Sequence, residues 1–293
     1  MAITSMKRLL RKAKDERYAI AAINIFNHLT ARAVIRVAEE LSSPVILQTS
    51  PGTVKFYGAT ELANMLMPMA EKTSVPVVIH LDHCTETSLA MDCLNAGWTS
   101  IMFDGSHLPL RENIKATRGI VKYAYSYDAS VEGELGTIAG VEEDIVINNG
   151  NEALVNLDDA IIFVKETGID AFAPAIGTNH GLYKNSPKIN FNLFSDIVRN
   201  IDCPCVVHGG TGLDDNVFEK LILLGATKIN ISTAIKIAYT SGFKKTLTED
   251  NLNPLKLDKY VSGSVESVVK KHLLLFGSAQ KTDGIHNDTM KGI

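Results

Sequence analysis

The sequence predicts a single α/β domain, a (β/α)8 TIM barrel with a short N-terminal helix and a C-terminal helical extension. Short runs rich in Val, Ile and Ala alternate with longer segments of helical period, which is the pattern of repeated βα units. Several helical segments end at a glycine just before the next strand, at Gly97, Gly168 and Gly225. A polar residue follows nearly every strand, as is typical of the functional rim of a barrel. Eight such units indicate one closed barrel domain over residues 1–293.

The predicted elements follow one another in barrel order. Residues 1–18 carry basic and acidic side chains and no long apolar stretch, so they indicate a short amphipathic helix. The eight strands are short apolar runs at Ala19–Ile25, Val45–Gln48, Val77–Leu81, Ser100–Phe103, Ala129–Glu132, Ala171–Ala175, Cys205–Val207 and Thr227–Ile231. Amphipathic helices separate them, among them Ala31–Leu41, Glu61–Glu71 and Asp158–Glu166. Beyond the last strand, Val265–Phe276 has a helical period, and the polar tail Gly277–Ile293 is expected to be mobile unless a neighbouring subunit orders it.

Composition and charge indicate a globular protein that acts on a small molecule. Hydrophobic residues make up 45% of the chain and charged residues 21%, which is ample for a large core. A net charge of −4 gives no general attraction to nucleic acid or to anionic lipid, so any phosphate must bind at a local site. The four cysteines, Cys84, Cys93, Cys203 and Cys205, lack CxxC spacing, and no apolar run is long enough to cross a membrane. We therefore expect reduced thiols and a cytoplasmic location.

Three histidines stand where an apolar run meets a turn: His83, His180 and His208. Imidazoles from separate strands of a barrel meet at one rim, where they suit zinc and leave one coordination position open for a substrate oxygen. The strand that holds His83 must break there, because alternation would otherwise send Asp82 and His83 to opposite faces. Asp82 can then act as a general acid or base beside the metal. The alternative is that Asp82 caps a helix next to a core histidine, while His80 belongs to the surroundings of the site or to the core.

Further carboxylates follow the fourth and fifth strands. Asp104 comes directly after one, and Glu132-Gly133-Glu134 ends the other, with Glu134 the better candidate for the metal side. The stretch 137–151 that follows is long, acidic and contains glycine. It is either a lid over the barrel mouth or an ordinary solvated loop.

A phosphate site is predicted after the last two strands. The segments His208-Gly209-Gly210-Thr211-Gly212 and Asn230-Ile231-Ser232-Thr233 lie where barrels commonly bind phosphate through backbone N–H groups and the start of a helix. A glycine-rich turn alone is weak evidence, but two adjacent strand ends with Gly, Ser and Thr strengthen it. Lys184, just beyond His180, can add a positive charge to the same phosphate.

These segments together resemble one enzyme family, the class II, zinc-dependent ketose-bisphosphate aldolases. The resemblance spans nearly the whole chain. Its specific parts, all in family order, are Val77-Val78-Ile79-His80-Leu81-Asp82-His83-Cys84, Val131-Glu132-Gly133-Glu134-Leu135-Gly136, Ala175-Ile176-Gly177-Thr178-Asn179-His180-Gly181 and Val207-His208-Gly209-Gly210-Thr211-Gly212.

The resemblance implies a role for each predicted residue. His83, His180 and His208 bind the catalytic Zn2+, which serves as the electron sink, and Asp82 exchanges the proton of the hydroxyl at the cleaved bond. Asp104 and Glu134 match positions that hold a second or displaced divalent ion, and Glu142 matches a lid carboxylate that exchanges the proton on the dihydroxyacetone carbon. The residues implied around the dihydroxyacetone phosphate are Gly181, Lys184, Gly209, Gly210, Thr211, Asn230, Ile231, Ser232 and Thr233, with Asn24 and Ser50 toward the rest of the substrate. A monovalent cation, Na+ or K+, joins that phosphate site in the family.

The implied reaction is the reversible aldol cleavage of a ketose 1,6-bisphosphate to dihydroxyacetone phosphate and glyceraldehyde 3-phosphate. After Asn230 the chain lacks the acidic and arginine residues typical of fructose-specific members, and no insertion separates His208 from Asn230. The Ser50-Pro51-Gly52-Thr53 turn also resembles the tagatose-bisphosphate branch more closely than the fructose-bisphosphate branch. Asn253-Pro254-Leu255 stands in place of a common Asp-Pro-Arg, which leaves binding of the second phosphate in question.

Alternatives come from other classes. One is an aldolase that uses dihydroxyacetone phosphate with a different aldehyde. Another is a metal-dependent hydrolase on the same barrel, although such enzymes usually place two histidines at i and i+2, and His80 and His83 are three residues apart. A third is a barrel that is non-catalytic or that needs a helper subunit for full activity. The family resemblance also implies a homodimer or homotetramer, while the net charge and the lack of a long apolar run indicate no nucleic acid or membrane as partner.

Overall fold

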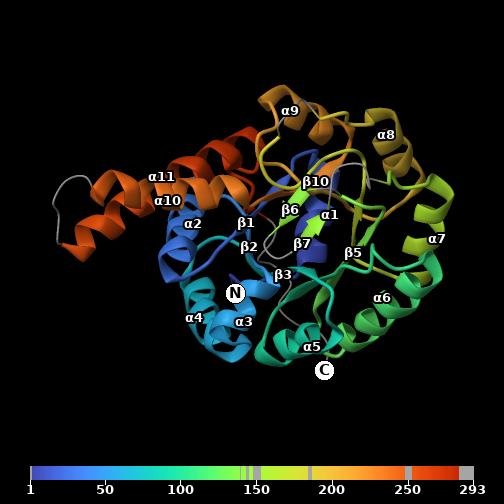
Figure 1. Ribbon diagram of the computed structural model, residues 1–293, viewed down its shortest axis with the longest axis horizontal. Helices are drawn as coiled ribbons and strands as arrows, with labels where there is room; N and C mark the ends of the chain where they lie inside the picture. The colour runs from blue at the N-terminus through green and yellow to red at the C-terminus, as the bar shows by residue number, and fades with distance from the viewer. Residues whose placement is uncertain are drawn as a thin grey trace.

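The computed structural model describes residues 2–138, 140–142, 145–147, 153–183, 187–247 and 253–283. Eight parallel strands among these residues close into a barrel in the order β1-β10-β9-β8-β5-β4-β3-β2, which confirms the predicted fold (Figure 1). The barrel strands are β1 (Ile20–Asn24), β2 (Val45–Thr49), β3 (Val77–Cys84), β4 (Ser100–Phe103), β5 (Ser130–Leu135), β8 (Ala171–Pro174), β9 (Cys205–Val207) and β10 (Ala226–Ile231). The first strand pairs with the last, so the carboxyl ends of all eight meet at one rim.

The predicted strands differ from the observed ones mainly at two carboxyl ends. β3 continues from Leu81 to Cys84, and β5 continues from Glu132 to Leu135. The sequence pattern excluded these residues because several of them are polar. Members of both extensions nevertheless pair with neighbouring strands. Their polar side chains are buried near the rim, so polarity in these segments does not mark the end of a strand.

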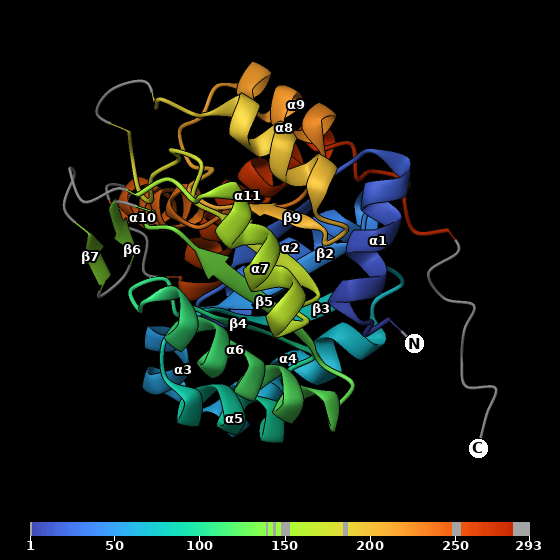
Figure 2. The same ribbon diagram turned by 90° about the vertical axis from the view of Figure 1, so that its right-hand side faces the viewer.

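Helices surround the barrel, and the N-terminal one covers one of its ends (Figures 1 and 2). They are α1 (Met6–Glu16), α2 (His28–Glu40), α3 (Pro51–Tyr57), α4 (Ala59–Lys72), α5 (Thr87–Ala96), α6 (Leu110–Tyr125), α7 (Leu157–Thr167), α8 (Phe191–Asn200), α9 (Asp215–Leu224), α10 (Thr233–Leu247) and α11 (Pro254–Leu275). The predicted glycine stops are confirmed for α5, α7 and α9, which end at glycines with φ of 114°, 71° and 118°. Glycine adopts this left-handed backbone without the clash that a Cβ would cause.

The N-terminal helix α1 closes the amino-terminal end of the barrel. Its apolar face, which includes Met6, Leu9 and Leu10, forms one buried cluster with side chains inside the barrel such as Ile46 and Val78. A second, larger cluster lies between the strands and the outer helices. Figure 2 shows α1 at one end of the barrel and the strands β6 (Gly140–Glu142) and β7 (Ile145–Ile147) at the other. Because α1 covers the amino-terminal end, a substrate must enter at the carboxyl-terminal rim.

The predicted lid segment contains an antiparallel hairpin rather than only a loop. β6 pairs with β7, and an isolated bridge between Thr137 and Ala153 joins the two ends of the segment. Figure 2 shows this hairpin beyond the carboxyl ends of the barrel strands, and in Figure 1 it overlaps the middle of the barrel. Its position is the one expected of a lid.

The C-terminal extension is longer than the sequence predicted. α11 packs against both α10 and α2, and the pair α10 and α11 projects from one side of the barrel (Figure 1). The expectation of a mobile tail is wrong for its first residues, because Ser278 is buried and the N–H of Gln280 donates to the carbonyl of Leu41. Among the described residues, no helix has the length and apolar character that a membrane crossing requires.

Candidate active site at the barrel rim

The three predicted histidines meet inside the rim. His83 belongs to β3, His180 follows β8 and His208 follows β9. One ring nitrogen of each lies within 4.8 Å of those of the other two. His83 and His208 are closest, with Nε2 of the first 2.8 Å from Nδ1 of the second. Burial lowers the pKa of His208 to about 3, so this imidazole is neutral at neutral pH, which is the form that binds a metal.

A break in β3 turns Asp82 and His83 toward the same interior. His83 has a φ of 47°, in the left-handed region, and the register between β3 and β4 shifts between Leu81 and Cys84. As a result both side chains are buried inside the barrel, where Asp82 contacts Asn230 and His83 contacts His208. The structure therefore shows the irregularity that the sequence predicted at this point.

Two carboxylates lie beside His83, and Oε2 of Glu134 is also 3.5 Å from Nδ1 of His208. Nδ1 of His83 lies 3.2 Å from Oδ2 of Asp104 and 3.9 Å from Oε2 of Glu134, and these three residues form a second group able to hold a metal ion. Burial alone would raise the pKa of Asp104, but hydrogen bonds with His83 and Ser106 hold it below its usual value. His83 thus faces His208 through one ring nitrogen and Asp104 through the other.

Two side-chain amides hold the Asp82 carboxylate. Gln48 Nε2 donates to Oδ2 over 3.0 Å, and Asn230 Nδ2 donates to Oδ1 over 3.0 Å. Gln48 also donates to Oδ1 of Asn24 over 2.5 Å. The following helix, α5, begins at Thr87 with Glu86 as its N-cap, so Asp82 does not cap a helix. This arrangement fixes the direction of a buried carboxylate beside the histidines.

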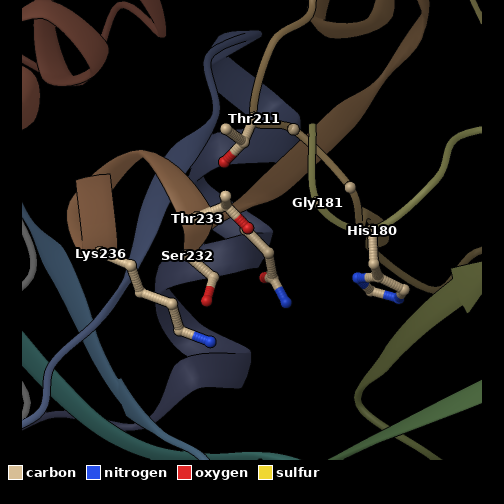
Figure 3. Close-up of a pocket in the computed structure, with 9 residues that line it drawn as sticks. His180, Gly181, Thr211, Ser232, Thr233 and Lys236 are labelled. Carbon is tan, nitrogen blue, oxygen red and sulfur yellow. The ribbon is translucent and has the colours of Figure 1, made fainter. Parts of the chain in front are cut away.

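A polar pocket adjoins the histidines, and most of the predicted phosphate residues line it (Figure 3). The lining residues are His180, Gly181, Gly209, Gly210, Thr211, Asn230, Ser232, Thr233 and Lys236. The helix α10 starts here at Thr233, and the positive end of a helix dipole favours an anion. Ser232 and Lys236 point toward the same opening as His180 (Figure 3).

One glycine of this pocket is required because two backbone segments lie very close together there. Gly209 has a φ of 70°, and a Cβ there would lie 2.4 Å from the carbonyl oxygen of Asn179. Tyr183 joins the same two segments, because its hydroxyl donates to the Gly209 carbonyl over 2.7 Å and accepts from the Asn179 N–H over 3.0 Å. The loop that carries His180 is thereby held against the loop that follows β9.

The other predicted site residues lie in varied surroundings. Ile231 packs into the hydrophobic core, so its side chain does not line the pocket. Asn24 lies beside Gln48, and Ser50 caps the start of α3. Glu142 belongs to β6, but its side chain and all of Lys184 lie outside the described residues.

Sequence reasoning missed several polar residues of this site. Gln48 was read as the end of an apolar strand, although its position two residues before Ser50 places it near the rim. Lys236 was missed because it lies within a helix; its place one turn after Ser232 and Thr233 is the signal that could have identified it. Lys228 was missed because it lies deeper in the barrel, and Glu132 was recognised only as the weaker of two candidate carboxylates.

Comparisons with known proteins agree with this geometry. The sequence model of the class II fructose-bisphosphate aldolases matches residues 4–281. The YdjI aldolase from Escherichia coli K12 is 30% identical, with 96% of this chain and 100% of that chain covered and a TM-score of 0.86. A candidate fructose-1,6-bisphosphate aldolase from Coccidioides immitis is 28% identical, with 94% and 96% covered and a TM-score of 0.86. The fructose-bisphosphate aldolase of Campylobacter jejuni, at 20% identity, shares the fold with a TM-score of 0.83 over 96% and 97% of the two chains. The chain therefore belongs to the class II fructose-bisphosphate aldolase family and is an aldolase, a lyase that cleaves a carbon–carbon bond.

Proposed function

We propose that this protein is a zinc-dependent aldolase that reversibly cleaves a ketose 1,6-bisphosphate to dihydroxyacetone phosphate and glyceraldehyde 3-phosphate. The observation that carries this proposal is the placement of three imidazoles, a clamped carboxylate and a polar anion pocket at one rim. A hydrolase would need the imidazoles, but it has no evident use for the adjoining pocket at the start of α10.

The donor set fits zinc. His83, His180 and His208 would hold the ion, and three protein ligands with one open position are typical of a catalytic zinc site. When bound, zinc supplies Lewis-acid stabilisation of the negative charge that develops on the ketone half of the substrate. Asp104 and Glu134 are the proposed ligands of a second or displaced divalent ion, because with His83 they form a second group able to hold a metal.

Asp82 is the proposed general base. It takes the proton from the hydroxyl on C4 while the C3–C4 bond breaks, so that the C4 carbon becomes the aldehyde and the electron pair stays on the dihydroxyacetone phosphate half. The amides of Gln48 and Asn230 orient the carboxylate for this transfer. Glu142 is the proposed donor of the proton that C3 then receives, by resemblance to the family.

The pocket at α10 is the proposed site of the dihydroxyacetone phosphate group. Backbone N–H groups near Gly209 and Thr233, the Ser232 hydroxyl and the Lys236 ammonium supply donors and positive charge there. Lys184 and a monovalent cation, Na+ or K+, are further proposed partners of this phosphate. Asn24 and Ser50 are proposed to face the rest of the sugar.

Tagatose 1,6-bisphosphate is the proposed preferred sugar, and fructose 1,6-bisphosphate the next. The support is the residue pattern after β10, which lacks acidic and arginine partners, and the absence of an insertion between His208 and Asn230. An aldolase that joins dihydroxyacetone phosphate to a different aldehyde is the second candidate. It is favoured by Leu255, which is apolar and 78% exposed at a position where the family resemblance implies an arginine.

The two sugars differ only at C4, so a side-by-side assay tests the proposal. We expect the zinc-loaded protein to cleave both, with the higher kcat/KM for tagatose 1,6-bisphosphate, measured as release of dihydroxyacetone phosphate. A higher kcat/KM for the fructose sugar would reverse the proposed preference. Failure to cleave either, by protein that holds zinc, would contradict the proposed substrate class. The next assay would be the reverse reaction of dihydroxyacetone phosphate with a panel of aldehydes. We propose that the protein is a homodimer or homotetramer, and a search for a helper subunit would follow if no aldehyde reacts.

A further inference from the structure

A fully buried set of charged and polar side chains lies one layer below the candidate metal centre. Lys228 on β10, Glu132 on β5 and His80 on β3 are each 0% exposed. Each lies two residues before a residue of the upper layer on the same strand, namely Asn230, Glu134 and Asp82. Because side chains alternate along a strand, each pair shares the inner face of the barrel. None of the lower three lines the pocket described above.

His208 joins the two layers through its two ring nitrogens. Nε2 lies 2.8 Å from Oε1 of Glu132, and Nδ1 lies 2.8 Å from Nε2 of His83. An ionised carboxylate only accepts hydrogen bonds, so Nε2 of His208 must carry a proton and donate the hydrogen bond that Glu132 accepts. The neutral ring then has its lone pair on Nδ1, directed toward the metal group. The tautomer that binds a metal is therefore set by a residue that does not reach the metal.

Glu132 in turn depends on Lys228. The Lys228 ammonium lies 2.9 Å from the second carboxylate oxygen, Oε2, and within the described residues Glu132 is the carboxylate that pairs with this ammonium. Nε2 of His80 lies 3.7 Å from the same carboxylate oxygen. Nδ1 of His80 is 2.8 Å from Oγ of Ser100, which fixes the ring. A carboxylate without water or a counter-ion is very unfavourable inside a protein. Lys228 thus allows Glu132 to stay ionised and directed at His208.

We propose that Glu132 and Lys228 are positioning residues of the metal centre: Glu132 fixes the orientation and tautomer of His208, and Lys228 holds Glu132 in place. This inference rests on the proposed zinc site. The competing explanation is that the ion pair merely stabilises the barrel. The two explanations differ in what they predict for metal affinity when the buried charges are removed together.

The sharpest comparison uses two charge-free double variants. Glu132→Gln with Lys228→Met keeps an oxygen that accepts from His208 Nε2, whereas Glu132→Leu with Lys228→Met removes this acceptor. Neither leaves an unpaired buried charge. We expect the variant with Leu to bind zinc about 10- to 100-fold more weakly than the variant with Gln, which is the usual effect of losing such a partner.

The readout is the zinc dissociation constant in competition with a chromophoric chelator, with the visible spectrum of the cobalt-loaded protein as a report on ligand geometry. Thermal unfolding of the metal-free proteins shows whether each is folded at the assay temperature. Lys270→Met, which removes a lysine paired with Glu40 at the surface, is the matched control and should leave zinc affinity unchanged. The single variant Lys228→Met should bind zinc more weakly than the double variant with Gln.

Equal zinc affinity and equal cobalt spectra in the two double variants would overturn the inference, because His208 would then need no acceptor. If either double variant does not fold, Glu132→Gln and Lys228→Met alone are compared with the wild-type protein, and unchanged zinc affinity in both overturns it. A wild-type protein that binds no zinc would instead contradict the proposed function. The two failures are therefore distinguishable.

Discussion

Asp82→Ala is expected to lower kcat by about 10²- to 10⁴-fold while zinc remains bound, which is the range for loss of a general acid or base. The carboxylate is the proposed acceptor of the substrate proton, whereas the three imidazoles that would hold zinc are untouched. Steady-state cleavage rates and the zinc content of the same preparation measure the two effects together.

Asp82→Asn is the necessary companion variant. Alanine leaves the amides of Gln48 and Asn230 without their carboxylate partner, which costs about 1–3 kcal/mol of stability for each buried donor. Asparagine keeps the size and one carbonyl oxygen, but it takes up no proton at neutral pH. Near-normal turnover in the asparagine variant would show that Asp82 has no role in proton transfer.

His180→Ala is expected to remove zinc and activity together. His180 is partly exposed, and its ring centroid lies 4.8 Å from that of His83 and 6.0 Å from that of His208. Loss of one of three ligands should lower the zinc content from about one ion per chain toward none. Metal analysis after gel filtration, with unfolding followed in parallel, separates loss of metal from loss of fold.

His28→Ala provides the matched control for that result. His28 is an exposed histidine at the start of α2, and it is not in either group of candidate metal ligands. It should keep both zinc and turnover. A His180→Ala protein that retained zinc as tightly as the control would contradict the proposed ligand set.

Much of the fold follows from local patterns in the sequence. Runs such as Val45–Gln48 and Cys205–Val207 are apolar because barrel strands are buried on both faces, and the observed strands begin and end within about one residue of them. The glycine stops at Gly97 and Gly225 are equally local, because a left-handed residue ends the helix. Such signals depend on neighbouring residues alone.

The convergence of the site was also predictable, since the ends of parallel strands meet at one rim. Asp82 and the histidines follow strands in the sequence, and the barrel brings them together. Deeper contacts were not predictable, because they depend on which strands face one another across the barrel. Lys228 and Glu132 are 96 positions apart in the sequence, and only the closed barrel shows that they pair.

The C-terminal tail illustrates another limit. Its polar composition predicted mobility, yet Ser278 is buried and donates to the carbonyl of Leu273, and Gln280 bonds to Leu41 at the end of α2. A polar segment becomes ordered when backbone groups of another element satisfy its hydrogen bonds. Leu41 is distant from Gln280 in the sequence, so no local pattern indicates this contact.

In the proposed mechanism, one zinc ion per chain, held by three histidines, carries the aldol cleavage. The most direct test of this claim is a zinc titration of the chelator-stripped protein, with cleavage of tagatose and fructose 1,6-bisphosphates followed at each addition. We predict negligible cleavage without metal and a linear rise that ends at about one zinc per chain. Full activity in the stripped protein would contradict the claim, as would zinc binding at that stoichiometry with no cleavage of either sugar.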